Sequence, residues 1–250
     1  MALKAVIFDY GGTLVQIRRP WDEVKPKAVL SVYRTLKRAG LKLPFEEYGE
    51  VNDRVFQKFG EMGDRQDRDI PDVVAYQEIV DGLFPERSGA WRTRTALEAA
   101  DAFWAVATGN FAVRRETRPA LRALKAMKLR MAVLSNHHHP PALVGHLSEL
   151  RIRQYFLKVL VSADAGVRKP NREIFEMCLG QLRVGPKQAV FVGDSVKYDV
   201  EGARNAGIRT ILVAGGPPYD NQGEGRVEPD FVVRDLLEVP VVVSSVNATG

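Results

Sequence analysis

The sequence predicts an α/β protein with a Rossmann-like open parallel sheet flanked by helices and a mostly helical cap inserted after the first strand. Short apolar runs alternate with helix-like segments along most of the chain, as expected of βαβ units. Residues 17–109 lack such runs and show helical spacing of apolar residues instead. Polar residues follow several of the apolar runs directly, as at the ligand-binding edge of a parallel sheet.

Six apolar runs are predicted to be the strands, because each ends in small or polar residues as buried parallel strands do. In chain order they are residues 4–9, 130–136, 158–163, 188–194, 209–214 and 230–234. Helices are predicted between them from their composition and from prolines near their starts. These helices span residues 119–128, 170–182 and 199–206, the last of which ends at Gly207 as a C-terminal glycine would end it.

The helical stretch divides the chain into two predicted domains. Residues 1–16 and 110–250 form the core domain, and residues 17–109, hereafter the helical insertion, form the cap domain. Within the insertion, residues 60–72 are predicted to be a loop between helices, because acidic and basic residues dominate them. The small polar tail 244–250 is predicted to fray.

Composition excludes several classes of protein. Hydrophobic residues make up 45% of the 250-residue chain, which is enough to form a core and excludes disorder of the whole chain. The net charge of +5 comes from scattered basic residues, so we expect no nucleic-acid partner. No apolar run is long enough for a membrane span, and residues 1–4 do not resemble a signal peptide. We therefore expect a cytoplasmic protein, monomeric or homodimeric.

Chemically active residues stand at the ends of the predicted strands or just beyond them. The residues at these positions are Asp9, Ser135, Asn136, Asp164, Lys169, Asp194 and Asp199. The carboxyl ends of parallel strands meet at one edge of a sheet, so we expect these groups to gather there. Hard oxygen ligands from a few carboxylates suit Mg²⁺, which leaves its remaining positions to water and phosphate. The pattern favours a magnesium site that binds a phosphate group.

These residues, in this order, resemble the haloacid dehalogenase superfamily of hydrolases along essentially the whole chain. The four motifs are Asp9-Tyr10-Gly11-Gly12-Thr13, Ser135, Lys169-Pro170, and Gly193-Asp194-Ser195 with Asp199. A helical insertion between the first two motifs is similar to the cap of one subfamily. The resemblance implies a magnesium-dependent phosphatase that acts on a small phosphorylated metabolite.

The resemblance also implies a role for each motif residue. Asp9 is expected to attack phosphorus and form an aspartyl-phosphate. Magnesium ligands are expected from Asp9, the backbone carbonyl of Gly11, Asp194 and Asp199, the last directly or by orienting bound waters. Phosphate contacts are expected from Gly12, Thr13, Ser135 and Asn136. Lys169 is expected to neutralise the charge of Asp9 and of the phosphoryl oxygens.

Gly11 departs from the pattern of the family's phosphatases, which carry a second aspartate at that position. That aspartate donates a proton to the leaving group and later activates water, which together contribute about 10²- to 10⁴-fold in rate. Glycine still offers a backbone carbonyl but transfers no proton. We therefore expect weak turnover of alkyl phosphates, with aryl and acyl phosphates suffering least because their leaving groups need little protonation.

Three alternatives remain open at this point. Haloacid dehalogenases lack the second aspartate and resemble the pair Ser135-Asn136, but they need no metal and lack an aspartate at the position of Asp194. Phosphonatases have a small residue at the position of Gly11 and form a Schiff base with a lysine of the cap. The third alternative is a catalytically weak module that binds a ligand or a partner.

The triplet His137-His138-His139 follows the second motif directly. The favoured interpretation is an exposed loop before Pro140, with replacement of the missing proton donor as the alternative, since histidine titrates near neutrality. Three tryptophans lie in or beside the insertion and are interpreted as core packing, although one could line the substrate face. They are Trp21, Trp91 and Trp104.

Overall fold

One open sheet of six parallel strands organises the molecule, which is described here by a computed structural model covering residues 2–214 and 227–249. The strand order is β5-β4-β1-β6-β7-β8. The strands are β1 (Ala5–Phe8), β4 (Arg130–Ser135), β5 (Lys158–Val161), β6 (Ala189–Gly193), β7 (Arg209–Val213) and β8 (Phe231–Val233). The predicted fold class is confirmed, and each strand falls within its predicted range.

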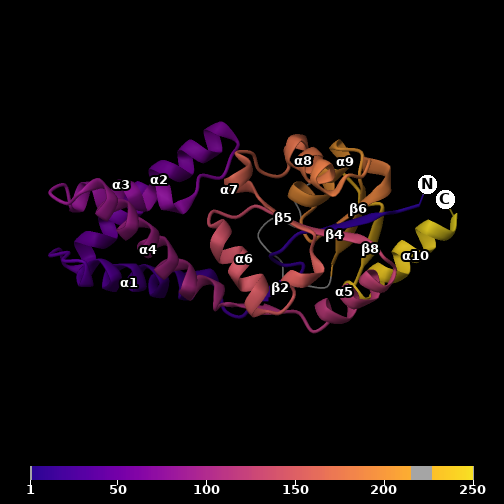
Figure 1. Ribbon diagram of the computed structural model, residues 1–250, viewed down its shortest axis with the longest axis horizontal. Coiled ribbons are helices and arrows are strands. Elements are labelled where there is room, and N and C mark those ends of the chain that lie inside the picture. The colour runs from indigo at the N-terminus through magenta and orange to yellow at the C-terminus, as the bar shows by residue number, and fades with distance from the viewer. Residues whose placement is uncertain (1, 215–226, 250) are drawn as a thin grey trace.

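Helices cover both faces of this sheet (Figure 1). One face packs against α5 (Thr117–Ala126), α6 (Pro140–Glu149) and α10 (Val239–Thr249), and the other against α8 (Arg172–Leu182) and α9 (Gly202–Asn205). Successive strand residues point to opposite faces. Val6 and Phe8 accordingly join the first core, whereas Ala5 and Ile7 join the second.

The helical insertion consists of four helices with a hydrophobic core of their own. They are α1 (Trp21–Arg38), α2 (Phe45–Gln66), α3 (Asp72–Leu83) and α4 (Gly89–Thr108). The chain enters and leaves the insertion through β2 (Val15–Ile17) and β3 (Phe111–Val113), an antiparallel pair that was not predicted. This pair lies at the proposed boundary between the two domains.

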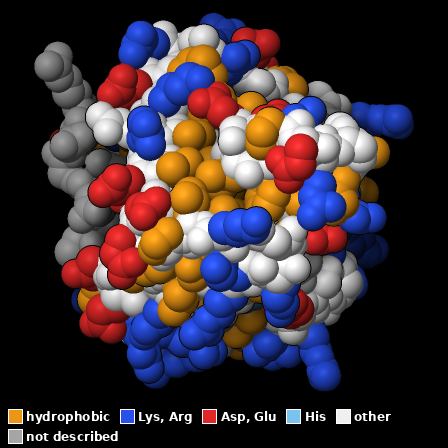
Figure 2. Space-filling view, turned by 90° about the vertical axis from the view of Figure 1, so that its left-hand side faces the viewer, with side chains coloured by type: hydrophobic (Ala, Val, Ile, Leu, Met, Phe, Trp, Pro, Cys, Tyr) orange, Lys and Arg blue, Asp and Glu red, His pale blue; other side chains and the backbone are white. Residues whose placement is uncertain are grey.

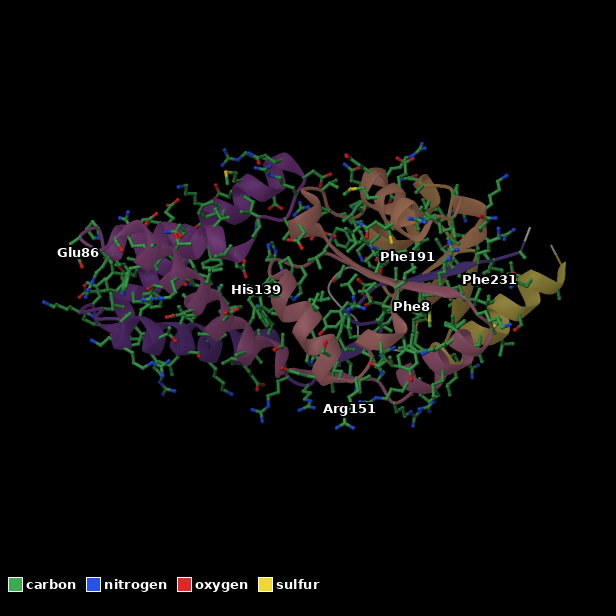
Figure 3. All side chains as sticks on the ribbon, in the orientation of Figure 1. Phe8, Glu86, His139, Arg151, Phe191 and Phe231 are labelled. Atoms are coloured by element: carbon green, nitrogen blue, oxygen red, sulfur yellow. The ribbon has the colours of Figure 1, made fainter. Side chains whose placement is uncertain are left out.

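The insertion occupies one end of an elongated molecule, and both described chain ends lie at the other end (Figure 1). Glu86 lies near the tip of the insertion, while His139 lies where the insertion meets the sheet domain (Figure 3). Seen from the tip, apolar side chains form a band bordered by charged ones (Figure 2). None of the helices in the described ranges has the length and apolar character needed to cross a membrane.

Two predictions about local structure are wrong. Residues 60–66 are not a loop, because α2 continues to Gln66 and ends at Asp67, whose backbone is left-handed. The last turn of α2 closes tightly at Gly63, where the Arg68 N–H donates to the Gly63 carbonyl at 3.0 Å. Residues 244–249 belong to α10, whose Val246 is buried against the core, and Gly250 lies outside the described residues.

Short helical turns complete the described fold. The helix predicted over 199–206 begins earlier, as a π-helical turn (Val196–Glu201) that continues into α9, and it ends at Gly207 with a φ of 74°. The short helix α7 (Ser162–Ala165) follows β5. Turns of 3₁₀ helix span Arg153–Tyr155, Pro186–Gln188 and Leu236–Glu238.

Candidate active site

The predicted site residues meet at one edge of the sheet. Asp9 follows β1, Asp194 follows β6, and Ser135 ends β4, so three neighbouring strands deliver them side by side. A cavity of about 880 Å³ is lined by all three of these residues. The other predicted residues that line it are Gly11, Asn136, Lys169 and Asp199.

Lys169 is held between two carboxylates. Its ammonium nitrogen lies 2.7 Å from Asp9 Oδ1 and 2.6 Å from Asp199 Oδ1. All three side chains are nearly inaccessible to solvent, so these charges interact with little screening by water. A buried pair of this kind fixes geometry, because removing one partner would leave a charge without compensation.

The same edge also has the arrangement of oxygens that a divalent cation needs. One carboxylate oxygen from each of Asp9, Asp194 and Asp199 lies within 4.8 Å of the others. Among the described residues, Lys169 is the one cation bonded to this group of three carboxylates. The remaining negative charge and the all-oxygen donor set fit Mg²⁺.

The pKa values reflect this excess of negative charge. Burial and the neighbouring carboxylates of Asp9 and Asp199 together raise the pKa of Asp194 to about 8. Burial also raises the pKa of Asp9 to about 6, although Lys169 opposes the rise. Burial alone would lower the pKa of Lys169, but the carboxylates of Asp199 and Asp9 raise it above its usual value. Lys169 therefore stays protonated while the carboxylates compete for protons.

Asp199 is engaged on both of its carboxylate oxygens. Oδ1 accepts from Lys169, and Oδ2 accepts from the backbone N–H groups of Asp194 and Ser195 at 3.1 and 3.0 Å. Ser195 caps the start of the π-helical turn that carries Asp199, and its hydroxyl accepts from the Tyr198 N–H at 3.1 Å. This geometry fixes the loop that presents Asp194. Of the two roles predicted for Asp199, direct binding of the metal and orientation of its waters, the geometry favours the second.

The loop after β1 approaches Asp194 closely. Gly12 has a φ of +83°, and a Cβ at this position would lie 2.1 Å from Asp194 Oδ2, so no other residue fits without displacement. The Thr13 hydroxyl, which is fully buried, donates to Asp194 Oδ1 at 3.1 Å. Thr13 thus orients the Asp194 carboxylate, while its predicted contact with phosphate stays a prediction.

Asn136 bonds to the backbone of Lys169 through both the nitrogen and the oxygen of its own side-chain amide. Its Nδ2 donates to the Lys169 carbonyl at 3.0 Å, and its Oδ1 accepts from the Lys169 N–H at 2.9 Å. Ser135 is buried and lines the cavity nearby. The geometry gives Asn136 a positioning role toward Lys169, and its predicted phosphate contact remains a prediction.

The interpretation of His137-His138-His139 as an exposed loop is wrong for two of the three residues. His137 and His139 are buried, because the loop passes beneath the insertion and His139 caps the start of α6, where its Nδ1 accepts from the Ala142 N–H. His137 lines the cavity with Asp9. Burial and its two histidine neighbours lower the pKa of His137 to about 3, so it is neutral near pH 7 and carries no acidic proton for a leaving group.

The three tryptophans differ in whether they line the active-site cavity. Trp91 packs against the core of the insertion, as interpreted. Trp104 belongs to that core as well, yet it also lines the cavity and lies 4.2 Å, between ring centroids, from His137. Trp21 is 43% exposed and lines the same cavity, so the core interpretation does not describe it.

One predicted strand-end residue lies apart from the site. The side chain of Asp164 is exposed on α7 and does not line the cavity. The strand that precedes it, β5, is at the edge of the sheet, farther from β6 than the strands that carry Asp9 and Ser135. Of the four carboxylates expected to gather, three do.

Sequence reasoning missed the contacts that join the insertion to the site. Arg168, next to Lys169, pairs with Asp64 at 2.9 Å and with Asp67 and Asp69 at 3.4 Å. Asp69 is buried and accepts a hydrogen bond from Ser162. These three of the four aspartates within residues 60–72 were the available signal, but nothing local identifies their partner.

The chain is similar to several known proteins. The model of one protein family, described as haloacid dehalogenase-like hydrolase, matches residues 3–207. A Bos taurus protein named haloacid dehalogenase-like hydrolase domain-containing protein 3 is 32% identical over 241 residues, which cover 88% of this chain and 85% of that protein.

Two further matches extend over nearly the full length of both chains. A glyceraldehyde 3-phosphate phosphatase from Methanothermobacter thermautotrophicus is 29% identical over 243 residues, covering 96% of this chain and 95% of that protein. The crystal structure of a 2-haloacid dehalogenase from Pseudomonas syringae pv. Tomato superposes with a TM-score of 0.68 at 21% identity, covering 97% and 99% of the two chains. At that identity the structural match concerns the fold alone.

Proposed function

The chain belongs to the haloacid dehalogenase-like hydrolase family, and on that premise we propose that it is a magnesium-dependent phosphatase that acts on a small phosphorylated metabolite. The observation that carries the proposal is the buried Asp9 carboxylate, held 2.7 Å from Lys169 Nζ within a cluster of three carboxylates. The phosphatase relative supports a phosphate monoester as the class of substrate.

Asp9 would act as the nucleophile. Its carboxylate attacks phosphorus, the bond from phosphorus to the leaving oxygen breaks, and the electron pair departs with that oxygen. Water then attacks the aspartyl-phosphate, breaks the bond between phosphorus and Asp9, and releases inorganic phosphate. Lys169 holds the Asp9 carboxylate in place, and with Ser135 it faces the cavity where the phosphoryl group would bind.

A magnesium ion would be held by Asp9, Asp194 and the backbone carbonyl of Gly11, with Asp199 binding directly or through waters. When bound, it would neutralise the charge on the phosphoryl oxygens. Thr13 and Asp199 would keep the Asp194 carboxylate in position for this role, because the first bonds its oxygen and the second bonds its backbone N–H.

Protonation of the leaving group is the weak step of this mechanism. Gly11 transfers no proton, and His137 is neutral near pH 7 because burial lowers its pKa to about 3. The leaving group would therefore depart as an anion and take its proton from solvent. Monoesters of acidic alcohols and acyl phosphates should react faster than alkyl phosphates.

Two other reactions of the family have less support here. Dehalogenation needs no metal and gives no reason for a buried Asp194 beside Asp9. A phosphonatase needs a desolvated lysine to form a Schiff base. Lys25 lines a neighbouring cavity, but its side chain is 52% exposed and lies 3.8 Å from Asp53.

The proposal is tested by hydrolysis of acetyl phosphate and para-nitrophenyl phosphate with Mg²⁺ and with chelator. We expect turnover that depends on the metal and falls about a thousandfold or more in Asp9→Asn, because the nucleophile is lost. Asp164→Asn, which alters an exposed aspartate outside the cavity, is the matched control and should behave as the wild type.

Other outcomes would point to other functions. Release of halide from a haloacid in the presence of chelator would replace the proposal with dehalogenation. Trapping of a substrate aldehyde by borohydride would indicate a phosphonatase. Binding of Mg²⁺ without turnover of any substrate would leave a ligand-binding module.

A further inference from the structure

A second cavity, of about 360 Å³, lies inside the helical insertion next to the active-site cavity. Three residues, Trp21, Trp104 and Arg168, line both cavities. The volume is in the range of sites for small organic molecules, roughly 300–1,000 Å³. A ligand whose phosphate lies at Asp9 would therefore meet this second cavity when it extends past Trp104.

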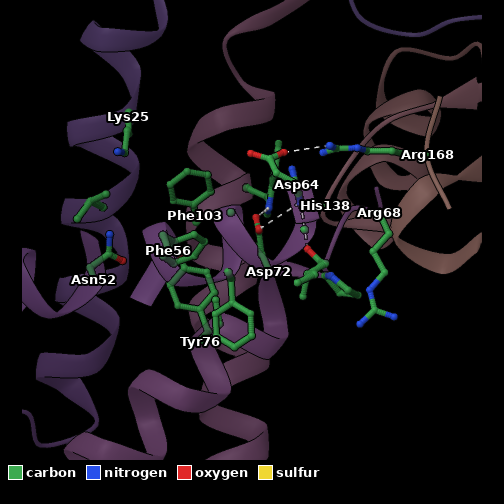
Figure 4. Close-up of a pocket in the computed structure, with 18 of the residues that line it drawn as sticks. Lys25, Asn52, Phe56, Asp64, Arg68, Asp72, Tyr76, Phe103, His138 and Arg168 are labelled. Carbon is green, nitrogen blue, oxygen red and sulfur yellow. Dashed lines mark hydrogen bonds and ion pairs between the residues drawn. The ribbon is translucent and has the colours of Figure 1, made fainter. Parts of the chain in front are cut away.

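Part of the wall of this cavity is aromatic. Its rings form a chain of contacts that starts at His137 in the active-site cavity and passes through Trp104 at 4.2 Å between centroids. The series of ring contacts continues from Trp104 to Phe103 at 5.6 Å, from Phe103 to Tyr76 at 6.5 Å and from Tyr76 to Phe56 at 5.0 Å, all between ring centroids. Figure 4 shows Phe103, Phe56 and Tyr76 grouped together, with Lys25 and Asn52 on the neighbouring helices. Planar apolar groups suit such walls, because aromatic rings pack edge to face or offset.

The inner part of the cavity offers a hydrogen-bond donor. The Tyr76 side chain is 1% exposed, and its hydroxyl has no hydrogen-bond partner among the described residues. A buried hydroxyl of this kind normally has a partner. Asn52, also buried, lines the same cavity, and its Oδ1 already accepts from the Tyr48 hydroxyl. A ligand atom that accepts from Tyr76 would satisfy the unpaired group.

The two carboxylates at the rim already have partners. Asp64 bonds to Arg168 at 2.9 Å, and Asp72 accepts from Trp104 Nε1 at 2.8 Å. Arg68 is exposed, and its guanidinium points away from the rings (Figure 4). The cavity is therefore suited to a neutral group rather than to a second ion.

We infer that this cavity receives the leaving group of the substrate, and that this group is an aromatic alcohol with a hydrogen-bond acceptor at the end remote from the phosphate. The inference rests on the proposed phosphatase function and names its class of substrate, an aryl phosphate monoester. Attack by Asp9 forms the aspartyl-phosphate and breaks the phosphorus–oxygen bond to the aryl group. The electron pair leaves on a phenolate, which takes a proton from solvent, and water later releases phosphate from Asp9.

A second, independent observation leads to the same class. Gly11 provides no proton for the leaving group, so the reaction favours leaving oxygens that are stable as anions. A phenolic hydroxyl has a pKa of about 10, as in tyrosine, whereas water, the nearest model for an aliphatic alcohol, has a pKa of about 15.7. The cavity selects an aromatic group, and Gly11 favours an acidic alcohol. An aryl phosphate meets both requirements.

The test compares three phosphates on the magnesium-loaded protein. 4-Methylumbelliferyl phosphate carries a bicyclic ring with a carbonyl remote from the phosphate, 2-naphthyl phosphate lacks the carbonyl, and acetyl phosphate has no group to fill the cavity. The readout is the ratio of kcat/KM for each aryl phosphate to that for acetyl phosphate. Differences in folded fraction cancel in this ratio.

We expect Phe103→Leu to lower the ratio for both aryl phosphates by about tenfold, mainly through KM, because a wall of the cavity is lost. Tyr76→Phe should lower the ratio severalfold for the umbelliferyl ester and leave the naphthyl ratio unchanged. Phe84→Leu and Tyr33→Phe are the matched controls, since these residues of the insertion line neither cavity. Both should keep the wild-type ratios.

A variant that adds atoms covers the case in which Phe103→Leu does not fold. Gly60 lies in α2 at the cavity, and a Cβ there meets no atom within 4 Å, so Gly60→Leu narrows the space without removing packing. It should also lower both aryl ratios. Unchanged ratios in all three cavity variants, with acetyl phosphate still hydrolysed, would overturn the inference and leave the phosphatase intact. No magnesium-dependent turnover of acetyl phosphate would overturn the proposed function itself.

Discussion

At the scale of single residues, we propose that Gly11 is the position that limits the chemistry of this site. It lines the cavity with Asp9, and a Cβ added there meets no atom within 4 Å. We expect Gly11→Asp to raise turnover of an alkyl phosphate such as glycerol phosphate about tenfold or more, because a general acid contributes about 10²- to 10⁴-fold. Acetyl phosphate should gain much less, since acetate leaves without a proton.

Gly11→Asn is the matched control for this change, because it has the same size and cannot transfer a proton. The measurement is kcat for both substrates in the wild type and the two variants. Equal rates for the aspartate and asparagine variants would mean that another group supplies the proton or that proton transfer does not limit the rate.

At the scale of elements, the last turn of α2 depends on the absence of a side chain at Gly63. A Cβ there would lie 2.8 Å from the Arg68 carbonyl oxygen. Replacing glycine by alanine within a helix normally stabilises a protein by about 0.5–1 kcal/mol. We expect the opposite sign for Gly63→Ala, a loss of about 1–2 kcal/mol in the free energy of unfolding, because the turn must open.

Gly49→Ala in the same helix is the control, since a Cβ there meets nothing within 4 Å. Urea denaturation should show a gain for Gly49→Ala and a loss for Gly63→Ala. A gain in both would mean that the last turn of α2 accommodates a side chain at position 63 without cost.

At the scale of the whole molecule, the sequence was informative where function depends on strand ends and failed where it depends on contacts between distant segments. Asp9, Lys169 and Asp194 could be predicted, because the order of strands and motifs brings them to one edge of the sheet. The burial of His137 and the double role of Trp104 arise where the insertion meets the core. No local pattern encodes that contact, so neither could be predicted.

The whole molecule also determines how stability depends on pH and on the metal. The folded protein raises the pKa of Asp194 to about 8 and that of Asp9 to about 6, above the ordinary value of 3.8. Carboxyls with raised pKa values favour the folded state at low pH, and this contribution is lost as pH rises through 6 and 8. Under the proposed function Mg²⁺ binds the ionised carboxylates, so adding it should raise the stability most at the pH values where the metal-free protein is least stable.

We therefore expect the affinity for Mg²⁺ to rise about tenfold per pH unit up to pH 8, where Asp194 becomes ionised. Isothermal titration with Mg²⁺ between pH 6 and pH 9, together with the shift in Tm on adding the metal, measures this dependence. Asp194→Asn should abolish most of it, whereas the exposed Asp164→Asn should keep it. An affinity that stays constant or falls as pH rises would contradict the assignment of Asp194 as the carboxylate that exchanges its proton for the metal.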